Sequence, residues 1–148
     1  MAKLLLIQGP AGGGKSQLYS QLLATGEITI IADYTRLFVA ATGVERDPIT
    51  GLYPVRSAQD AAVRDGTASY LQVALVRHSL RNDRDTAVTT SRAAQEARWQ
   101  AVADEFDAEF EVRTVDPGRE VVTERLRAQS GTGELLEECA TAISRWYR

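Results

Sequence analysis

The chain has 148 residues, of which 44% are hydrophobic and 25% charged, proportions typical of a globular protein that can build one sizeable core. The net charge of −3 disfavours nucleic-acid binding through a strongly basic surface, although a local basic cleft stays open. The one cysteine, Cys139, excludes an internal disulfide and a multi-cysteine metal site. Since no apolar run approaches the length of a membrane span, we expect a cytoplasmic protein.

A short apolar run at the start of the chain leads into a glycine-rich segment. Lys3–Gln8 has the composition of one buried strand, and Gly9–Ser16 reads G-P-A-G-G-G-K-S, which fits the phosphate-binding loop pattern G-x-x-x-x-G-K-[ST]. A helix-like stretch from Lys15 to Ala24 follows, so the motif has the strand and the helix that it requires. We therefore predict a nucleotide site here, rather than a turn that binds nothing.

Each part of the motif has a predicted role. The glycines are expected to take positive φ and to turn backbone N–H groups inward as an anion nest, and the following helix adds its positive end. Lys15 would reach the β- and γ-phosphates of ATP or GTP, and the Ser16 hydroxyl would bind Mg²⁺. The predicted nucleotide-binding residues are Gly9, Gly12, Gly13, Gly14, Lys15, Ser16 and Gln17.

The rest of the chain alternates between strand and helix patterns. Further strands are predicted at Glu27–Ala32, Thr86–Thr90 and Phe110–Val115. The predicted helices begin near Asp33–Arg36, run over Ser57–Leu80 with an interruption at Gly66, over Arg92–Asp107 after a Ser91 cap, from the turn Asp116–Gly118 to Gln129, and over Glu134–Tyr147. This order predicts an α/β fold, a three-layer sandwich of the P-loop NTPase type with a mostly parallel sheet, in one domain over residues 1–148.

Ligands of parallel α/β sheets bind at the carboxyl ends of the strands. That rule gathers the phosphate loop, Asp33–Arg36, Thr89–Arg92 and the turn after Val115 into one cleft. Two segments are predicted to border it. The long loop 42–56, with Arg46, Tyr53 and Arg56, would recognise a substrate, and the region of about 118–133 would move as a lid.

Asp33 and Arg36 are the candidates for chemistry beside the loop. The Asp33 carboxylate would accept the proton of a hydroxyl that attacks the γ-phosphate, and it would serve Mg²⁺ as well as, or instead of, that hydroxyl. The alternative is a helix N-cap. Arg36, one helical turn on, would hold a substrate phosphate or steady Asp33, with a plain surface arginine as the alternative.

Positive charge over the transferring phosphate would come from the predicted lid. Among Arg119, Arg125 and Arg127, we choose Arg125, although arginines paired with glutamates on a solvated helix face are an open alternative for each. The strand Thr86–Thr90 has no acid at its end, where a P-loop ATPase usually holds Mg²⁺ through water. This absence disfavours a motor-type ATPase and favours a small kinase.

With these residues the chain resembles the small P-loop kinases, and among them the polynucleotide 5′-hydroxyl kinases. The resemblance rests on Gly9–Ser16, on Ala32–Arg36 with its general-base Asp33 and substrate-side Arg36, and on the run Glu96–Arg127. It implies transfer of the ATP γ-phosphate to a hydroxyl acceptor, with Mg²⁺, and favours the 5′-hydroxyl of a nucleic acid or a nucleoside-like molecule.

Two departures from the family pattern keep a second hypothesis open. Gln129 stands where the lid of this family usually has a second arginine, and Thr89-Thr90 stands where the family has an acid that contacts the nucleoside. The second hypothesis is a nucleotide-binding ATPase module, with slow or no hydrolysis, that acts through an unknown protein partner.

Overall fold

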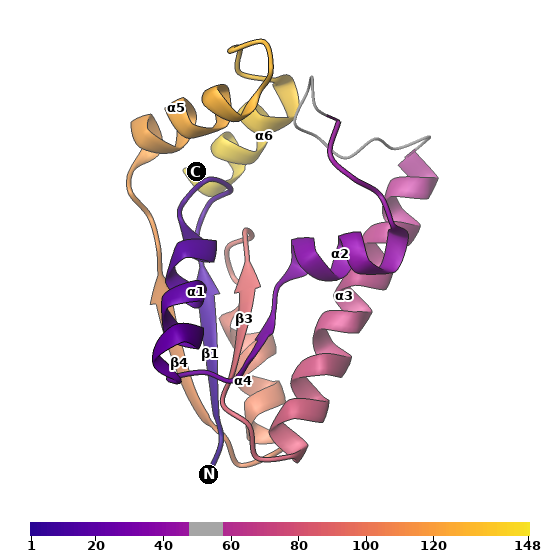
Figure 1. Ribbon diagram of the computed structural model, residues 1–148, viewed down its shortest axis with the longest axis vertical. Helices are drawn as coiled ribbons and strands as arrows, with labels where there is room; N and C mark the ends of the chain where they lie inside the picture. The colour runs from indigo at the N-terminus through magenta and orange to yellow at the C-terminus, as the bar shows by residue number, and fades with distance from the viewer. Residues whose placement is uncertain (48–57) are drawn as a thin grey trace.

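The computed structural model describes residues 1–47 and 58–148, and within them strands and helices alternate as the sequence predicts (Figure 1). The strands are β1 (Lys3–Gln8), β2 (Ile30–Ala32), β3 (Thr86–Thr90) and β4 (Glu109–Thr114). The helices are α1 (Lys15–Thr25), α2 (Tyr34–Thr42), α3 (Ala58–Arg81), α4 (Glu96–Asp104), α5 (Arg119–Gln129) and α6 (Glu137–Trp146).

The four strands form one parallel sheet in the order β2-β3-β1-β4. Leu4 of β1 pairs with Thr86 of β3 on one side and with Phe110 of β4 on the other. The chain order reverses at β1, and such a reversal is where open parallel sheets place their ligand site. The predicted parallel sheet is confirmed, and Asp33 follows the strand one removed from β1.

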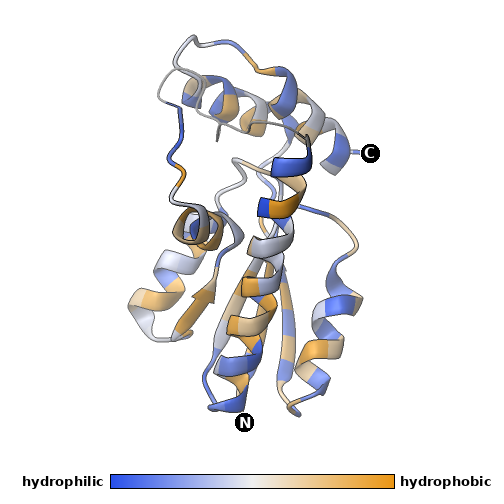
Figure 2. Cartoon of the chain, turned by 90° about the vertical axis from the view of Figure 1, so that its right-hand side faces the viewer, coloured by the Kyte–Doolittle hydropathy of each residue, from blue (hydrophilic) through white to orange (hydrophobic). Residues whose placement is uncertain are grey.

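Helices cover both faces of the sheet and give the predicted three layers. Strand β1 is buried on both sides, because Leu4 and Leu6 pack toward α3 and α4 while Leu5 and Ile7 pack toward α1. Each of these four side chains is fully buried, which stabilises the fold by on the order of 2 kcal/mol apiece. The helices carry alternating hydrophobic and hydrophilic residues (Figure 2), as expected for helices that pack one face on a sheet.

Helices α5 and α6 pack on each other beyond the carboxyl ends of the strands (Figure 1). Their shared cluster contains Val122, Leu126 and Ile143, with Ala11 of the glycine-rich loop against it. The end of α6 is tied to the turn before α5, since Tyr147 Oη and Trp146 Nε1 both donate to the carboxylate of Asp116. This helix pair therefore forms one wall above the edge where the strands end.

Several element boundaries differ from the sequence prediction for local reasons. Strand β2 begins at Ile30 rather than Glu27, because the Gly26 and Ile28 N–H groups bond back to carbonyls of α1 and hold this stretch as a turn. Gly66 does not interrupt α3, which is continuous. Strand β4 starts and ends one residue earlier than predicted.

The later helix starts also shift. Helix α4 begins at Glu96, not Arg92, so Ser91 is not its cap, and α6 begins at Glu137, not Glu134. The N-cap of α5 is Gly118, and the Asp116 carboxylate accepts from the Gly118 N–H instead of capping the helix. Among the helices of the described residues, none combines the length and the apolar composition needed to cross a bilayer.

Candidate active site

The glycine-rich loop joins β1 to α1, and its glycines serve two different needs. Gly12 and Gly14 have φ of 76° and 99°, the left-handed region that the sequence predicts for the whole set. Gly9 and Gly13 do not, and there the prediction is wrong. A Cβ at Gly9 would lie 2.2 Å from the Val115 carbonyl oxygen, and one at Gly13 would lie 2.9 Å from the same atom. These two glycines let the turn after β4 pass directly against the loop.

Lys15 is enclosed by oxygen atoms of its own loop and of the segment after β3. Its Nζ donates to the carbonyls of Gly9 (2.7 Å) and Pro10 (3.0 Å) and to Ser91 Oγ (2.9 Å). Burial lowers the pKa of the Lys15 ammonium to about 8, against the opposing pull of the Asp33 charge. The contact between Lys15 and Ser91 was not predicted from the sequence. Its one indication there is that Ser91 directly follows the end of β3.

Asp33 is both the N-cap of α2 and a lining residue of the cleft. Its Oδ2 accepts from the Arg36 N–H (3.0 Å), and its Oδ1 accepts from Thr89 Oγ1 (2.9 Å). Below them the buried Gln72 side chain donates to the carbonyls of Ala32 (2.9 Å) and Thr89 (2.8 Å), and so clamps the ends of β2 and β3 together. The carboxylate is therefore held in a fixed orientation by the helix cap, which the sequence offers as an alternative, and by the Thr89 contact, which the sequence could not pair.

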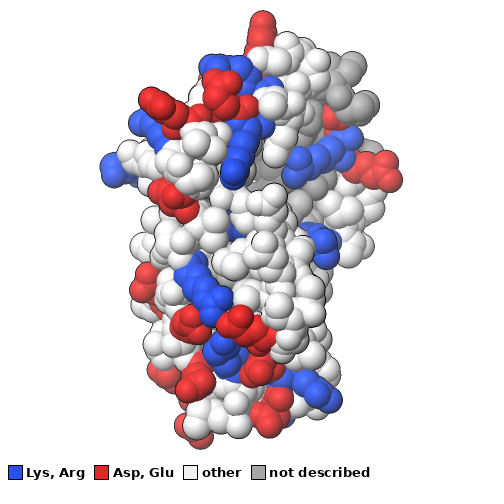
Figure 3. Space-filling model, turned by 60° about the vertical axis from the view of Figure 1, so that its left-hand side comes forward, with Lys and Arg blue, Asp and Glu red and all other residues white. Residues whose placement is uncertain are grey.

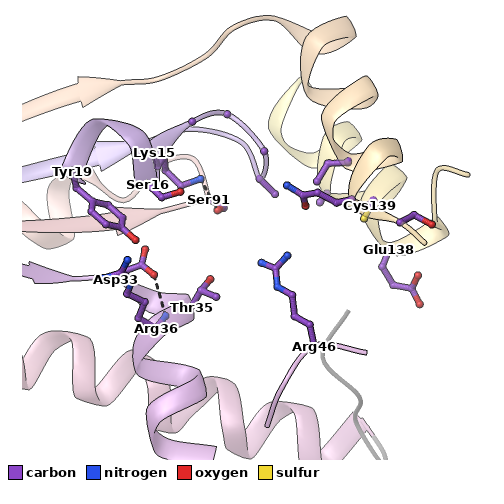
Figure 4. Close-up of a pocket in the computed structure, with 18 residues that line it drawn as sticks. Lys15, Ser16, Tyr19, Asp33, Thr35, Arg36, Arg46, Ser91, Glu138 and Cys139 are labelled. Atoms are coloured by element: carbon purple, nitrogen blue, oxygen red, sulfur yellow. Dashed lines mark hydrogen bonds between the residues drawn. The ribbon is translucent and has the colours of Figure 1, made fainter. Parts of the chain in front are cut away.

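Arg36 lies over an aromatic ring from the opposite side of the cleft. Its guanidinium carbon is 5.3 Å from the centroid of the Tyr19 ring, within the range of a cation–π contact. Tyr19 is buried, one turn after Lys15 on α1 (Figure 4), and burial together with the Asp33 charge raises the pKa of its hydroxyl. The predicted pair Asp33 and Arg36 thus faces α1, and Tyr19 is a site residue that sequence reasoning missed.

Two adjoining cavities meet beside Lys15 and Asp33. The first, of about 580 Å³, is bounded by the glycine-rich loop, the start of α2 and the wall formed by α5 and α6. The second, of about 330 Å³, opens toward α3 and α4. Both are lined by Lys15, Asp33, Thr35 and Ser91. Basic side chains gather around the hollow below α5 and α6 (Figure 3), where a polyanion would be attracted.

Most of the site residues predicted from the sequence line the first cavity. Those that line the first are Gly12, Gly13, Gly14, Lys15, Ser16, Asp33 and Arg36. Gln17 is exposed and lies outside both linings, as does Gly9, where a Cβ would collide with the Val115 carbonyl oxygen. In the loop 42–56, Arg46 lines the first cavity, whereas the predicted Tyr53 and Arg56 lie outside the described residues.

Helix α5 brings one of its predicted arginines to the glycine-rich loop. The Arg125 guanidinium donates to the Gly12 carbonyl oxygen at 3.1 Å, and a Cβ at the same glycine would lie 3.3 Å from the Leu126 side chain. Arg127 instead forms an ion pair with Glu124 of the same helix. This agrees with the alternative interpretation, in which such an arginine pairs with a glutamate on the solvated face of the helix. Gln129 lines the first cavity without adding charge.

The residues present fit a magnesium ion held mainly by a nucleotide. In the part of the chain that the structure describes, no group of three or more His, Cys, Asp or Glu side chains could hold a metal by itself. Mg²⁺ in phosphate sites usually takes one or two protein oxygens and completes its shell with phosphates and water. Ser16 and Asp33 line the same cavity and could supply those two oxygens.

Comparison with known proteins places this chain in a family. The family model described as AAA domain matches residues 4–146, and no curated protein matches. A putative kinase from Chloroflexus aurantiacus is similar in structure, with a TM-score of 0.71 at 10% identity over 96% of this chain and 77% of that one. A tunicamycin resistance protein from Deinococcus radiodurans gives 0.60 at 18% identity, over 99% and 79%.

Two chains of the Pnkp1/Rnl/Hen1 complex, described in one case as an RNA repair complex, are also similar, each at 16% identity. They give TM-scores of 0.64 and 0.71 over 84% and 99% of this chain. This chain spans 38% and 44% of their lengths, so it matches less than half of each. At such identities the likeness concerns the fold. Since the family model matches nearly the whole chain, the protein belongs to this AAA domain family, and its fold is that of a small P-loop kinase resembling the polynucleotide kinases.

Proposed function

We propose that the protein is a kinase that transfers the γ-phosphate of ATP, with GTP as the alternative donor, to a hydroxyl acceptor. The observation that carries the proposal is the junction of the two cavities, where Lys15 and Asp33 line both. A nucleotide on the glycine-rich loop would fill the first cavity and bring its γ-phosphate to this junction. An acceptor in the second cavity would present its hydroxyl to the same point from the other side.

The proposed reaction uses Lys15 and Asp33, which line both cavities, together with Ser16 of the first cavity and Arg125, which bonds to the glycine-rich loop. Asp33 accepts the proton of the acceptor hydroxyl, whose oxygen forms a bond to the γ-phosphorus. The bond from the γ-phosphorus to the β–γ bridging oxygen breaks, and ADP leaves. Lys15 and Arg125 neutralise the charge of the transferring group. Mg²⁺, held through Ser16 and Asp33, would add positive charge at the β- and γ-phosphates when bound.

The lining of the second cavity supports a polar acceptor that carries an anionic group. Arg92 and Arg98 line it, and Arg92 is 3.6 Å from the Asp65 carboxylate. Such a lining suits the 5′-hydroxyl end of a nucleic acid or a nucleoside-like molecule with a phosphate. Trp99 is 1% exposed, so it is a core residue rather than a stacking platform for a base. Arg36 lines the first cavity and not the second, so the lining favours its predicted role beside Asp33 over a contact with the body of the acceptor.

The test is transfer of label from γ-labelled ATP, with Mg²⁺, to a panel of 5′-hydroxyl DNA and RNA oligonucleotides, nucleosides and small alcohols. Label on one acceptor, lost with Lys15→Ala, would identify the substrate class. Asp33→Asn is the sharper variant, because asparagine caps a helix as well as aspartate does and the fold is kept. We expect it to lower transfer by at least about 10²-fold and to leave ATP binding nearly intact. Asp104→Asn, on the exposed side of α4, is the matched control.

A second candidate function is a nucleotide-binding module with slow hydrolysis that acts through a protein partner. One observation favours it, since both Asp33 carboxylate oxygens already accept hydrogen bonds within the chain, as a purely structural cap would. Label found only as free phosphate, released faster with a protein partner but not with any hydroxyl acceptor, would favour the module. Normal turnover by Asp33→Asn would show that Asp33 is not the base.

A further inference from the structure

Gln72 is a buried polar residue in the middle of α3, below the candidate site. Its side chain belongs to a residue that is 5% exposed, and the residues one turn before and after it, Ala68 and Val76, are apolar and fully buried. Burial of an amide costs free energy unless its hydrogen-bonding groups have partners, whereas an apolar side chain would pack at this position without that requirement. Helix packing alone therefore does not explain a glutamine here.

The partners of Gln72 are the ends of two strands. Its Nε2 donates to the Ala32 carbonyl of β2 at 2.9 Å and to the Thr89 carbonyl of β3 at 2.8 Å. The pairing of β2 with β3 runs from Ile30 only as far as Ala32, which lies opposite Val88. Gln72 thus joins the two strands at the point where their own pairing ends.

The two carbonyls belong to the residues that place Asp33. Asp33 directly follows Ala32, and the hydroxyl that donates to its Oδ1 at 2.9 Å is the hydroxyl of Thr89. The Tyr34 N–H donates to the same Thr89 oxygen at 3.4 Å. A change in the separation of the two strand ends would therefore displace the carboxylate from its hydrogen-bond donor and from the junction of the cavities.

The donor side of the site has supports of its own. The glycine-rich loop follows β1, whose pairing with β3 continues to Thr90, and Lys15 bonds to two carbonyls of the loop itself. We propose that Gln72 is a positioning residue, which joins the ends of β2 and β3 and so fixes the place at which the Asp33 carboxylate meets the acceptor hydroxyl. This inference rests on the proposed function.

The first test is a comparison of phosphate transfer with ATP binding. Gln72→Met keeps the length of the side chain and removes both donors. Because a displacement of about 1 Å can cost about 10²-fold in rate, we expect kcat to fall by about 10- to 100-fold, while ATP affinity changes by less than about twofold. Gln72→Asn, which keeps the amide on a shorter side chain, is a second variant for which the same split is expected.

Val76→Ala is the matched control, because Val76 is buried on the same helix in the core cluster of the sheet and has no polar group. Urea unfolding establishes that every variant is folded under the assay conditions. We expect Val76→Ala to lower the unfolding midpoint and to leave kcat within about twofold of the wild type. A loss of stability and a loss of positioning are thereby separated.

A double-mutant cycle tests whether Gln72 acts through Asp33. Gln72→Met should lower transfer in the wild-type background and change it by less than about twofold in the Asp33→Asn background, where the base is already absent. Single-turnover assays with labelled ATP measure the residual transfer. A glutamine that serves the fold alone would lower transfer equally in both backgrounds.

Hydrogen exchange of the Arg36 backbone amide tests the clamp without any acceptor. Since α2 begins at Tyr34, this N–H belongs to the first turn, which has no helical carbonyl to bind, and its partner is Asp33 Oδ2 at 3.0 Å. We expect the Arg36 amide to exchange about tenfold faster or more in Gln72→Met, and within about twofold of the wild-type rate in Val76→Ala.

Four outcomes would overturn the proposal. They are equal losses of kcat in Gln72→Met and Val76→Ala, a full further loss in the Asp33→Asn background, and unchanged Arg36 exchange in Gln72→Met. The fourth is a higher KM for the acceptor at unchanged kcat, which would make Gln72, a lining residue of the second cavity, an acceptor contact. A wild type that phosphorylates no acceptor would contradict the proposed function instead, and the Arg36 exchange would still decide whether Gln72 holds Asp33.

Discussion

Raising the pH through the pKa of Lys15 should weaken nucleotide binding well below the pH at which an ordinary lysine loses its charge. A lysine with the ordinary pKa of 10.5 stays protonated at pH 9, but burial lowers the pKa of Lys15 to about 8. Its protonated fraction then falls from about 90% at pH 7 to about 10% at pH 9. Because the charged form binds the phosphates, affinity for ATP should drop about tenfold across this window.

The lysine content of the chain makes the titration directly observable. The sequence has two lysines, Lys3 and Lys15, so NMR of protein labelled in lysine at the ε position shows two titrating signals. Lys15→Arg assigns them by deleting one, and its guanidinium stays charged throughout, so its ATP affinity should not change between pH 7 and pH 9. A Lys15 signal with a midpoint near 10.5, or a wild-type ATP affinity that is flat to pH 9, would refute the reasoning.

Three further predictions concern stability. Gly9→Ala puts a Cβ 2.2 Å from the Val115 backbone oxygen and should cost about 1–3 kcal/mol in urea unfolding. Gly66→Ala, inside α3 with open space around it, should stabilise by about 0.5–1 kcal/mol, and equal effects of the two would contradict the close contact. Tyr147→Phe removes the hydroxyl that lowers the Asp116 pKa, so we expect a loss of about 1 kcal/mol at pH 7. That loss should fade as the pH falls below 3.8 and through the lower pKa that Asp116 has in the folded protein, and a loss independent of pH would contradict the ion–hydroxyl contact.

The order of elements could be predicted because it depends on local pattern. The apolar run Lys3–Gln8 and the helix after the glycine-rich loop have the predicted type and position. The predicted element boundaries are wrong where tertiary contacts determine the structure of the backbone. Glu27–Thr29 has a strand composition, yet its backbone completes the end of α1 and Thr29 bonds to the Asp85 carbonyl. A pattern of side chains does not reveal which carbonyl a backbone N–H will find.

The same division applies to the candidate site. Lys15 and Ser16 were found because the motif fixes their spacing, and Asp33 because strands end at one edge of the sheet. Tyr19 and Gln72 were missed, since their contacts join α1 to α2 and α3 to the strand ends. Both read as ordinary helix residues in the sequence. Their partners lie 17 to 40 residues away, beyond the reach of any periodicity.

The missing acid after β3 has a physical counterpart in the structure. Thr89 near the end of β3 donates its hydroxyl to Asp33, so a carboxylate from the end of β2 occupies the position beside β3. One side chain would then have to serve both the metal and the acceptor hydroxyl. The variant Asp33→Asn distinguishes the two roles. If it loses phosphate transfer while ATP binding keeps the same dependence on Mg²⁺, Asp33 acts as the base alone. A parallel loss of Mg²⁺ dependence would mean that Asp33 also takes the place of the absent acid.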